Sequence, residues 1–217
     1  MSHKEQLKFI GTMKQVFPER FSGGRVLEIG SLDINGSTRS FFSDGDYLGI
    51  DVAPGAGVDL VCQGQDYAGP SDSFDTVISC EVMEHNPFWV ETMRNMTRVC
   101  KPGGMVIMTC ATLGRGEHGT QRTSPDSSPL TVGLGWTYYR NLTANDFREA
   151  SALDGLDHVF AVNFGSYDLY MVGIKGSALP VDAAKLADIV NHYRWLPFRS
   201  LRNLRRAIKS SVLRRRQ

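Results

Sequence analysis

The chain has 217 residues, which suits one α/β domain and is short for two. Its hydrophobic content of 41% and charged content of 22% are ordinary for a soluble globular protein. No apolar run approaches the ~20 residues that a membrane span needs. Since the first residues are polar and lack the core of a signal peptide, we expect a cytoplasmic protein.

Charge is unevenly distributed along the chain. From Arg194 to the end there are nine Lys and Arg residues and no acid, which leaves 15 of the 24 basic residues against 23 acids in residues 1–193. Any affinity for nucleic acid or membrane is therefore expected in the tail, residues 194–217. The four cysteines form no C-x-x-C pair, so buried reduced thiols are expected rather than a zinc site or disulfides.

Short apolar strands alternate with helices along most of the chain. An amphipathic helix is predicted over 5–17, and further helices over 88–100 and 143–151. The strands that alternate with them predict a mostly parallel sheet with helices on both faces. They cover residues 25–30, 46–52, 58–62, 74–80 and 105–110.

Two further strands, 157–164 and 168–175, are separated by only three residues, so they must pair antiparallel. Before them, residues 112–141 hold many Gly, Ser and Thr residues and two prolines. We expect this segment to lack regular structure and to act as a lid over a site. A single domain over 1–193 and a separate tail are thus predicted.

The first strand ends in "LEIGSLDINGS", where Gly30 would let a ligand approach the backbone. A helix expected after this loop would offer amide donors. The G-x-G-x-x-G pattern of dinucleotide sites is absent, because Leu32 stands where the second glycine belongs. Glu28 would repel a pyrophosphate but could organise the loop around a cationic ligand. Asp51, 21 residues after Gly30, either accepts hydrogen bonds from both hydroxyls of a ribose or caps a turn.

The stretch "CEVMEHN" follows the fourth strand and allows three interpretations. Glu81, Glu84 and His85 stand at positions i, i+3 and i+4, on one side of a helical turn. They could hold a divalent cation, include a general base, or only order the turn.

Four motifs in order now carry a family resemblance: Glu28-x-Gly30, Asp51 at the end of the second strand, "FDTVIS", and "VCKPGGMVIMT". Over residues 22–175 the chain resembles the class I S-adenosylmethionine-dependent methyltransferases, particularly the methyltransferase type 11 group. The resemblance implies a Rossmann-like, seven-stranded, mostly parallel sheet with an antiparallel C-terminal hairpin. It makes 1–193 a methyltransferase domain and S-adenosylmethionine its cofactor.

The resemblance also implies a cofactor site. The methionine part would lie near Glu28, Gly30 and Ser31, the ribose at Asp51 and the adenine against Val52. Asn35 either replaces a missing glycine contact or caps the next element. The remaining expected cofactor residues stand by the adenine edge or the reactive methyl group, and are Gln63, Gly64, Cys80 and Glu81.

The E-x-x-E-H arrangement resembles that of metal-dependent O-methyltransferases of ubiquinone biosynthesis and of small-RNA 2′-O-methyltransferases. The latter add a histidine after the fifth strand, where this chain has His118. Unless the cluster only orders the turn, the resemblance implies two alternatives: Glu81, Glu84, His85 and His118 would hold Mg²⁺ or another divalent cation, or His85 or His118 would be the catalytic base. Both alternatives point to oxygen as the methyl acceptor.

The lid supplies expected substrate residues: Trp136 and Tyr139 as flat faces, Arg122 and Arg140 as cations. They suit a saccharide or an aromatic acid. The expected function is O-methylation of a hydroxyl on a saccharide or other small molecule. An RNA 2′-O-methyltransferase is disfavoured by the acidic body, and a non-catalytic, S-adenosylmethionine-binding scaffold is a further alternative.

The tail places Leu201, Leu204, Ile208 and Val212 on one helical stripe among arginines. Such a basic amphipathic helix could lie on an anionic membrane, which would make the protein peripheral at the inner membrane surface. It could instead contact another protein or pack on the acidic body.

Overall fold

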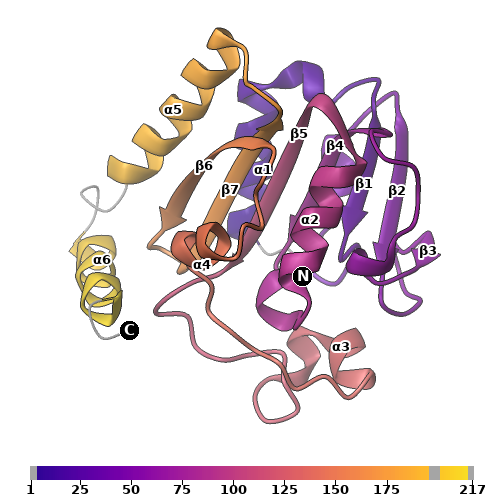
Figure 1. The fold of residues 1–217 in the computed structure, drawn as a ribbon. Helices are drawn as coiled ribbons and strands as arrows, with labels where there is room; N and C mark the ends of the chain where they lie inside the picture. The colour runs from indigo at the N-terminus through magenta and orange to yellow at the C-terminus, as the bar shows by residue number, and fades with distance from the viewer. Residues whose placement is uncertain (1–3, 196–200, 215–217) are drawn as a thin grey trace.

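A seven-stranded sheet runs through the centre of the protein (Figure 1). The structure is a computed structural model that describes residues 4–195 and 201–214. The strand order is β3-β2-β1-β4-β5-β7-β6; β1 to β5 are parallel, and β7 runs antiparallel to both β5 and β6. All seven expected strands and the antiparallel hairpin are confirmed. The strands are β1 (Arg25–Ile29), β2 (Asp46–Asp51), β3 (Leu60–Val61), β4 (Phe74–Cys80), β5 (Cys100–Ala111), β6 (Leu156–Asn163) and β7 (Asp168–Lys175).

Helices cover both faces of the sheet. Successive strand residues point to opposite faces, and the neighbours Val77 and Ile78 of β4 are both fully buried, in separate hydrophobic clusters. The cluster around Val77 contains residues of α2 (Trp89–Val99) and α4 (Ala144–Glu149). The cluster around Ile78 contains residues of α1 (Lys4–Val16) and α5 (Pro180–Trp195).

Three segments differ from the expectations. No α-helix follows β1, and the loop holds only a 3-10 turn, η2 (Thr38–Phe41). The side chains of Asp33 and Ser37 accept hydrogen bonds from nearby backbone N–H groups, which stabilises turns rather than a helix. The lid is not without regular structure, since it contains η5 (Pro125–Ser127) and α3 (Pro129–Gly133). The helix α5 was not predicted.

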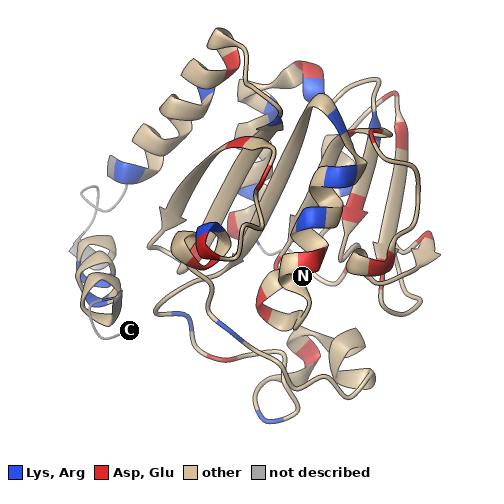
Figure 2. Ribbon diagram, in the orientation of Figure 1, with Lys and Arg blue, Asp and Glu red and all other residues tan. Residues whose placement is uncertain are grey.

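The expected tail is divided between two helices. Residue 194 lies in the last turn of α5, and α6 (Leu201–Arg214) holds most of the rest; residues 196–200 and 215–217 lie outside the described part. Figure 2 shows basic residues on α6 and no acidic ones. Within the described ranges, no helix is long and apolar enough to cross a membrane. The four cysteines are free; Cys80, Cys100 and Cys110 are buried as expected, whereas Cys62 is half-buried.

Candidate active site

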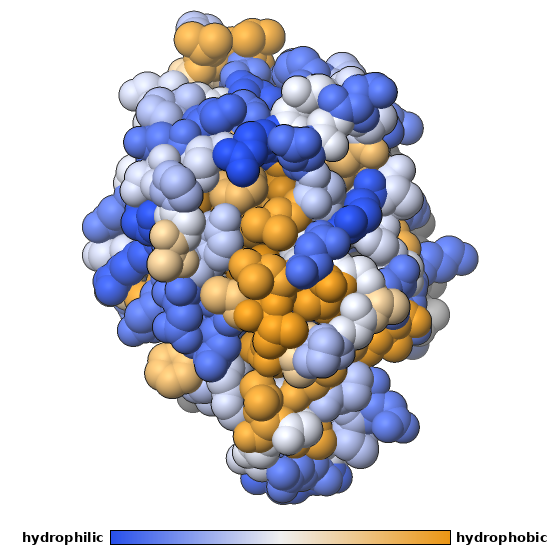
Figure 3. Space-filling model, turned by 90° about the vertical axis from the view of Figure 1, so that its right-hand side faces the viewer, coloured by the Kyte–Doolittle hydropathy of each residue, from blue (hydrophilic) through white to orange (hydrophobic). Residues whose placement is uncertain are grey.

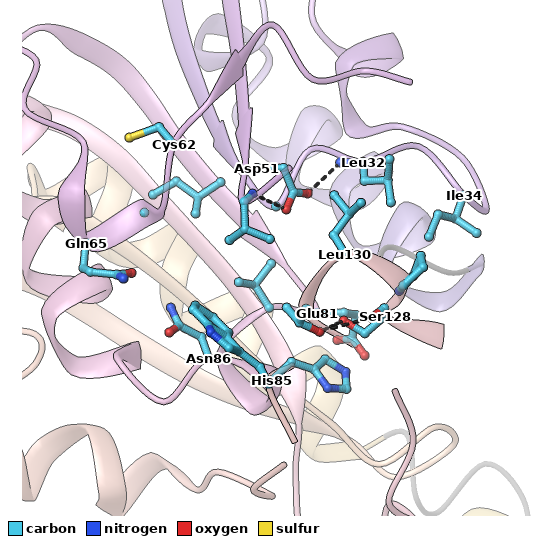
Figure 4. Close-up of a pocket in the computed structure, with 18 residues that line it drawn as sticks. Leu32, Ile34, Asp51, Cys62, Gln65, Glu81, His85, Asn86, Ser128 and Leu130 are labelled. Carbon is cyan, nitrogen blue, oxygen red and sulfur yellow. Dashed lines mark hydrogen bonds between the residues drawn. The ribbon is translucent and has the colours of Figure 1, made fainter. Parts of the chain in front are cut away.

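A cleft opens at the carboxyl ends of β1, β2 and β4, on the face shown in Figure 3. That view shows a band of apolar side chains. Of the apolar residues that line the cleft, Ile34 is exposed. The cleft is open to solvent, and its empty volume, which includes that open space, is about 620 Å³. Residues 128–131 and Trp136 of the lid close one side, so α3 covers the ligand space (Figure 4).

Asp51 stands at the end of β2 and lines this cleft. Its Oδ2 accepts a hydrogen bond from the Leu32 amide at 3.0 Å, and its Oδ1 accepts one from the Val52 amide at 2.7 Å (Figure 4). Burial raises the pKa of the carboxyl group, and the two amides partly oppose that effect. Each oxygen keeps a lone pair, so the carboxylate can hold the loop after β1 and still accept hydrogen bonds from a ligand.

Gly30 begins the loop after β1 at a φ of +82°. An added Cβ would lie only 2.1 Å from Cγ2 of Val82 in the turn after β4. Only glycine therefore lets these two strand ends approach each other beside the cleft.

The expected cofactor residues divide into two groups. Gly30, Asp51, Val52, Gly64 and Glu81 line the cleft. The others stand outside its lining: Glu28, Ser31, Asn35, Gln63 and Cys80.

Glu28 and Gln63 do not line the cleft but accept hydrogen bonds from residues that shape it. The buried carboxylate of Glu28 accepts hydrogen bonds from Thr38 Oγ1 at 2.7 Å and from Tyr47 Oη at 2.8 Å, which fixes the loop after β1 to β2. Gln63 Oε1 accepts a hydrogen bond from Gln65 Nε2 at 2.7 Å, and Gln65 itself lines the cleft.

Several lining residues were not anticipated from the sequence. They come from the loop after β1, the turn after β3, the turn after β4 and the lid, and include Leu32, Ile34, Cys62, Gln65, Asn86 and Leu130. The position of Asn86, directly after the E-x-x-E-H cluster, was an available signal.

Glu84, His85 and His118 converge at one end of the cleft. One potential ligand atom from each lies within 4.8 Å of the others. Glu81 turns the chain after β4 with a φ of +57°, and the 3-10 turn η4 (Met83–His85) then directs the next residues inward. The lid can approach this turn because Gly119 has a φ of +61° and no side chain; a Cβ there would lie 2.7 Å from His85 Cε1.

Two polar atoms of this cluster, Glu84 Oε2 and His85 Nδ1, are buried and have no hydrogen-bond partner among the residues that the structure describes. Glu84 Oε1 accepts a hydrogen bond from the Ala111 amide at 3.1 Å, and His118 Nδ1 lies 3.0 Å from the Gly116 carbonyl oxygen. Since unsatisfied buried polar atoms are costly, these two atoms are suited to coordinate a bound ligand.

The electrostatics of the cluster favour a cation. Burial lowers the pKa of His85 to about 3 and also lowers that of His118, so both imidazoles are neutral at pH 7. Burial and the nearby Glu84 raise the pKa of Glu81 to about 8, and burial and Glu81 raise that of Asp168 to about 8. Burial raises the pKa of Glu84 too. A bound divalent cation would stabilise these carboxylates.

Three of the four expected metal ligands thus come together. Glu81 is not in the group; its Oε1 accepts a hydrogen bond from Thr109 Oγ1 at 3.2 Å, and the residue lines the cofactor cleft. The donor set of two imidazoles and one carboxylate, with the orphaned oxygen and nitrogen, fits a divalent cation.

The four expected substrate residues have different surroundings. Trp136 lines the cleft, while the Tyr139 ring lies 5.5 Å from that of His85 and 5.1 Å from that of His118. The two arginines lie outside the cleft lining and form ion pairs, Arg122 with Glu117 and Arg140 with Asp146.

Comparison with known proteins identifies the class. A family model described as a methyltransferase domain matches residues 38–108. Among solved structures, the CurJ carbon methyltransferase is 16% identical with a TM-score of 0.55, over 79% of this chain and 54% of that one. The 1,6-didemethyltoxoflavin-N1-methyltransferase of Burkholderia thailandensis, with bound S-adenosylhomocysteine, is 13% identical with a TM-score of 0.54, over 79% and 78%. Phosphoethanolamine N-methyltransferase 2 of Haemonchus contortus, in complex with S-adenosyl-L-methionine, is 15% identical with a TM-score of 0.52, over 79% and 57%.

At these identities the structures show the fold, which is the Rossmann-like class I methyltransferase fold expected from the sequence. The family match over residues 38–108 and the fold both agree with the resemblance to class I methyltransferases that was expected from the sequence. The chain spans about half of the CurJ structure, 54%, so that likeness extends to only part of the larger protein. No curated protein matches the sequence.

Proposed function

We propose that this protein transfers a methyl group from S-adenosylmethionine to a hydroxyl of a small molecule, such as a saccharide, with the help of a divalent cation. The observation that carries the proposal is the convergence of Glu84, His85 and His118 beside the end of β4. Two structures with the same fold hold S-adenosylhomocysteine or S-adenosylmethionine, which supports the cofactor assignment.

The cleft offers suitable partners for each part of the cofactor. Asp51 would accept hydrogen bonds from the ribose, Val52 and Gly64 would border the adenine, and Gly30 would admit the methionine part close to the backbone. When bound, the cofactor supplies a methyl group on a sulfonium, which is already activated for transfer. The protein must then position the acceptor and manage its proton.

The nature of the acceptor follows from this need. An amine or a carboxylate attacks without strong assistance, whereas a hydroxyl must lose its proton to become a good nucleophile. A bound cation lowers the pKa of a coordinated hydroxyl, and the cluster lies beside the cleft because His85 lines it. These features favour oxygen as the acceptor.

Cation binding explains the histidines better than general base catalysis by His85. An imidazole with a pKa of about 3 is a weak base, but it is neutral and therefore ready to bind a metal at every physiological pH. Because Mg²⁺ prefers oxygen ligands, the two imidazoles favour Zn²⁺ or Mn²⁺.

The test is methyl transfer from labelled S-adenosylmethionine to a panel of phenols, sugar nucleotides and amines. Chelation is expected to abolish transfer to hydroxyls, and Zn²⁺ or Mn²⁺ to restore it. His85→Ala and His118→Ala should each reduce the rate at least about 100-fold. His192→Ala, on the exposed side of α5, is the matched control and should not change it. Transfer to amines alone would contradict the oxygen assignment, and activity unaffected by chelation would contradict the metal.

A further inference from the structure

The outward face of α6 carries an apolar stripe, in which Leu204 is half-buried and Ile208 and Val212 are exposed. Leu204, Ile208 and Val212 follow one another at intervals of four residues, which aligns them along one side of the helix. Ile208 is 58% exposed and Val212 is 47% exposed. Isolated apolar residues on a surface are common, but a continuous stripe on one helix indicates a partner.

The opposite side of the helix fixes this orientation. Ser210 is 1% exposed and therefore faces the body of the protein. Arg206, one turn earlier, donates a hydrogen bond to the carbonyl oxygen of Gly165, and its guanidinium lies 5.3 Å from the centre of the Tyr167 ring. Two positions away from Ser210, Ile208 points to the other side of the helix, so the stripe faces away from the body.

The stripe has basic borders. Arg205 and Lys209 stand next to it on the helix and are exposed. There is no acidic residue from Arg194 to the end of the chain, and Figure 2 shows the same absence on the described α6. The charge on this surface is therefore complementary to an anionic partner.

We propose that α6 docks on the surface of an anionic lipid membrane. Ile208 and Val212 would enter the boundary between headgroups and acyl chains, while Arg205 and Lys209 would lie among the anionic headgroups. The combination of one narrow apolar stripe with basic flanks is the pattern of interfacial helices. Since the stripe is short, binding is expected to be reversible. Because the basic residues contribute to it, binding is also expected to weaken as the salt concentration increases. The proposal does not depend on the reaction that the cleft catalyses.

The body-facing side of α6 is also connected to the start of the lid. Tyr167, which contacts Arg206, accepts a hydrogen bond through its backbone oxygen from the Thr112 amide at 2.9 Å. Arg115 donates to the Ser166 carbonyl oxygen at 2.7 Å. The turn that receives α6 is thus bonded to the first residues of the lid.

Vesicle flotation tests the proposal with neutral phosphatidylcholine vesicles and with vesicles that contain 30% phosphatidylglycerol. The full-length protein is expected to bind the anionic vesicles at least tenfold better than the neutral ones. Ile208→Asp with Val212→Asp should reduce this binding at least tenfold, and so should Arg205→Glu with Lys209→Glu. The matched control is Leu179→Asp with Val181→Asp, which changes two exposed apolar residues near the start of α5 and should bind as the wild type does.

Three results would overturn the proposal. The first is absence of binding by the wild type or equal binding to both vesicles. The second is unchanged binding by the Ile208→Asp, Val212→Asp variant. The third comes from light scattering of the same samples: a dimeric wild type and a monomeric variant would show that the stripe binds a second copy of the chain. Thermal unfolding shows whether each variant is folded. If the Ile208→Asp, Val212→Asp variant is unstable, the variant with Arg205→Glu and Lys209→Glu, which changes only exposed residues, still tests the proposal.

Discussion

Replacing Asp51 by asparagine is expected to weaken the binding of S-adenosylmethionine by about 30- to 150-fold. In the structure both carboxylate oxygens act as acceptors, from the Leu32 amide at 3.0 Å and the Val52 amide at 2.7 Å. Asparagine has one acceptor oxygen, so its NH₂ group must face one of these two N–H donors. The loop after β1 would shift, and one acceptor for the ribose would be lost.

The magnitude follows from the charge of the group. Hydrogen bonds to charged groups contribute about 1.5–3 kcal/mol, and a loss of about 2–3 kcal/mol corresponds to the stated change in Kd. Isothermal titration calorimetry measures it directly. The matched control is Asp33→Asn, which removes a charge from the same region but keeps Oδ1, the acceptor for the Gly36 amide at 2.9 Å. A Kd for the Asp51→Asn variant within threefold of the wild type would refute the reasoning. An equal loss of affinity in the Asp51→Asn and Asp33→Asn variants would show that the effect comes from net charge.

Three further substitutions test contacts in different parts of the fold. Gly30→Ala places a Cβ 2.1 Å from Val82 at a φ of +82°, so the free energy of unfolding should fall by about 2 kcal/mol or more. Denaturant unfolding measures this change, and an unchanged midpoint would contradict the prediction. Burial acts to raise the pKa of Asp75, but its hydrogen bonds from Lys101 and backbone N–H groups outweigh burial and lower it. Asp75→Asn should therefore lower the free energy of unfolding by about 0.5 kcal/mol at pH 7. This difference between variant and wild type should vanish as the pH falls below about 4, the pKa of the carboxyl group in the unfolded chain, and through its lower pKa in the folded protein. A difference that persists at low pH would argue against the ion pair. Asn141→Ala removes the hydrogen bond from Nδ2 to the Arg115 carbonyl oxygen, which joins the two ends of the lid, and a local one from Tyr139. Limited proteolysis within 116–138 should therefore become faster, and an unchanged cleavage rate would show that Asn141 does not hold the lid.

The strands were predictable because a parallel sheet covered on both faces leaves short, mostly apolar runs; β4, for example, is buried along nearly its whole length. The helix α5 was harder to recognise. Its buried residues Leu186, Ile189 and Tyr193 have helical spacing, but alanines and scattered charges separate them. The helix expected after β1 did not form because side chains such as that of Asp33 satisfy the local backbone in turns.

The site was predictable where residues are close in sequence. Glu84 and His85 belong to one turn, but only the path of the lid shows that His118 reaches them. Strand position alone could not show that Glu28 faces away from the cleft, toward Thr38 and Tyr47. Nor could the lid composition show that its arginines pair with acids near them in sequence.

The most direct test of the central claim is a calorimetric titration of the wild-type protein with S-adenosylmethionine and, in parallel, with NAD. Asp51, Gly30 and the apolar walls of the cleft predict one S-adenosylmethionine bound per chain and no measurable binding of NAD, because the phosphate-binding glycines are absent. Failure to bind S-adenosylmethionine, or tighter binding of NAD, would contradict the account.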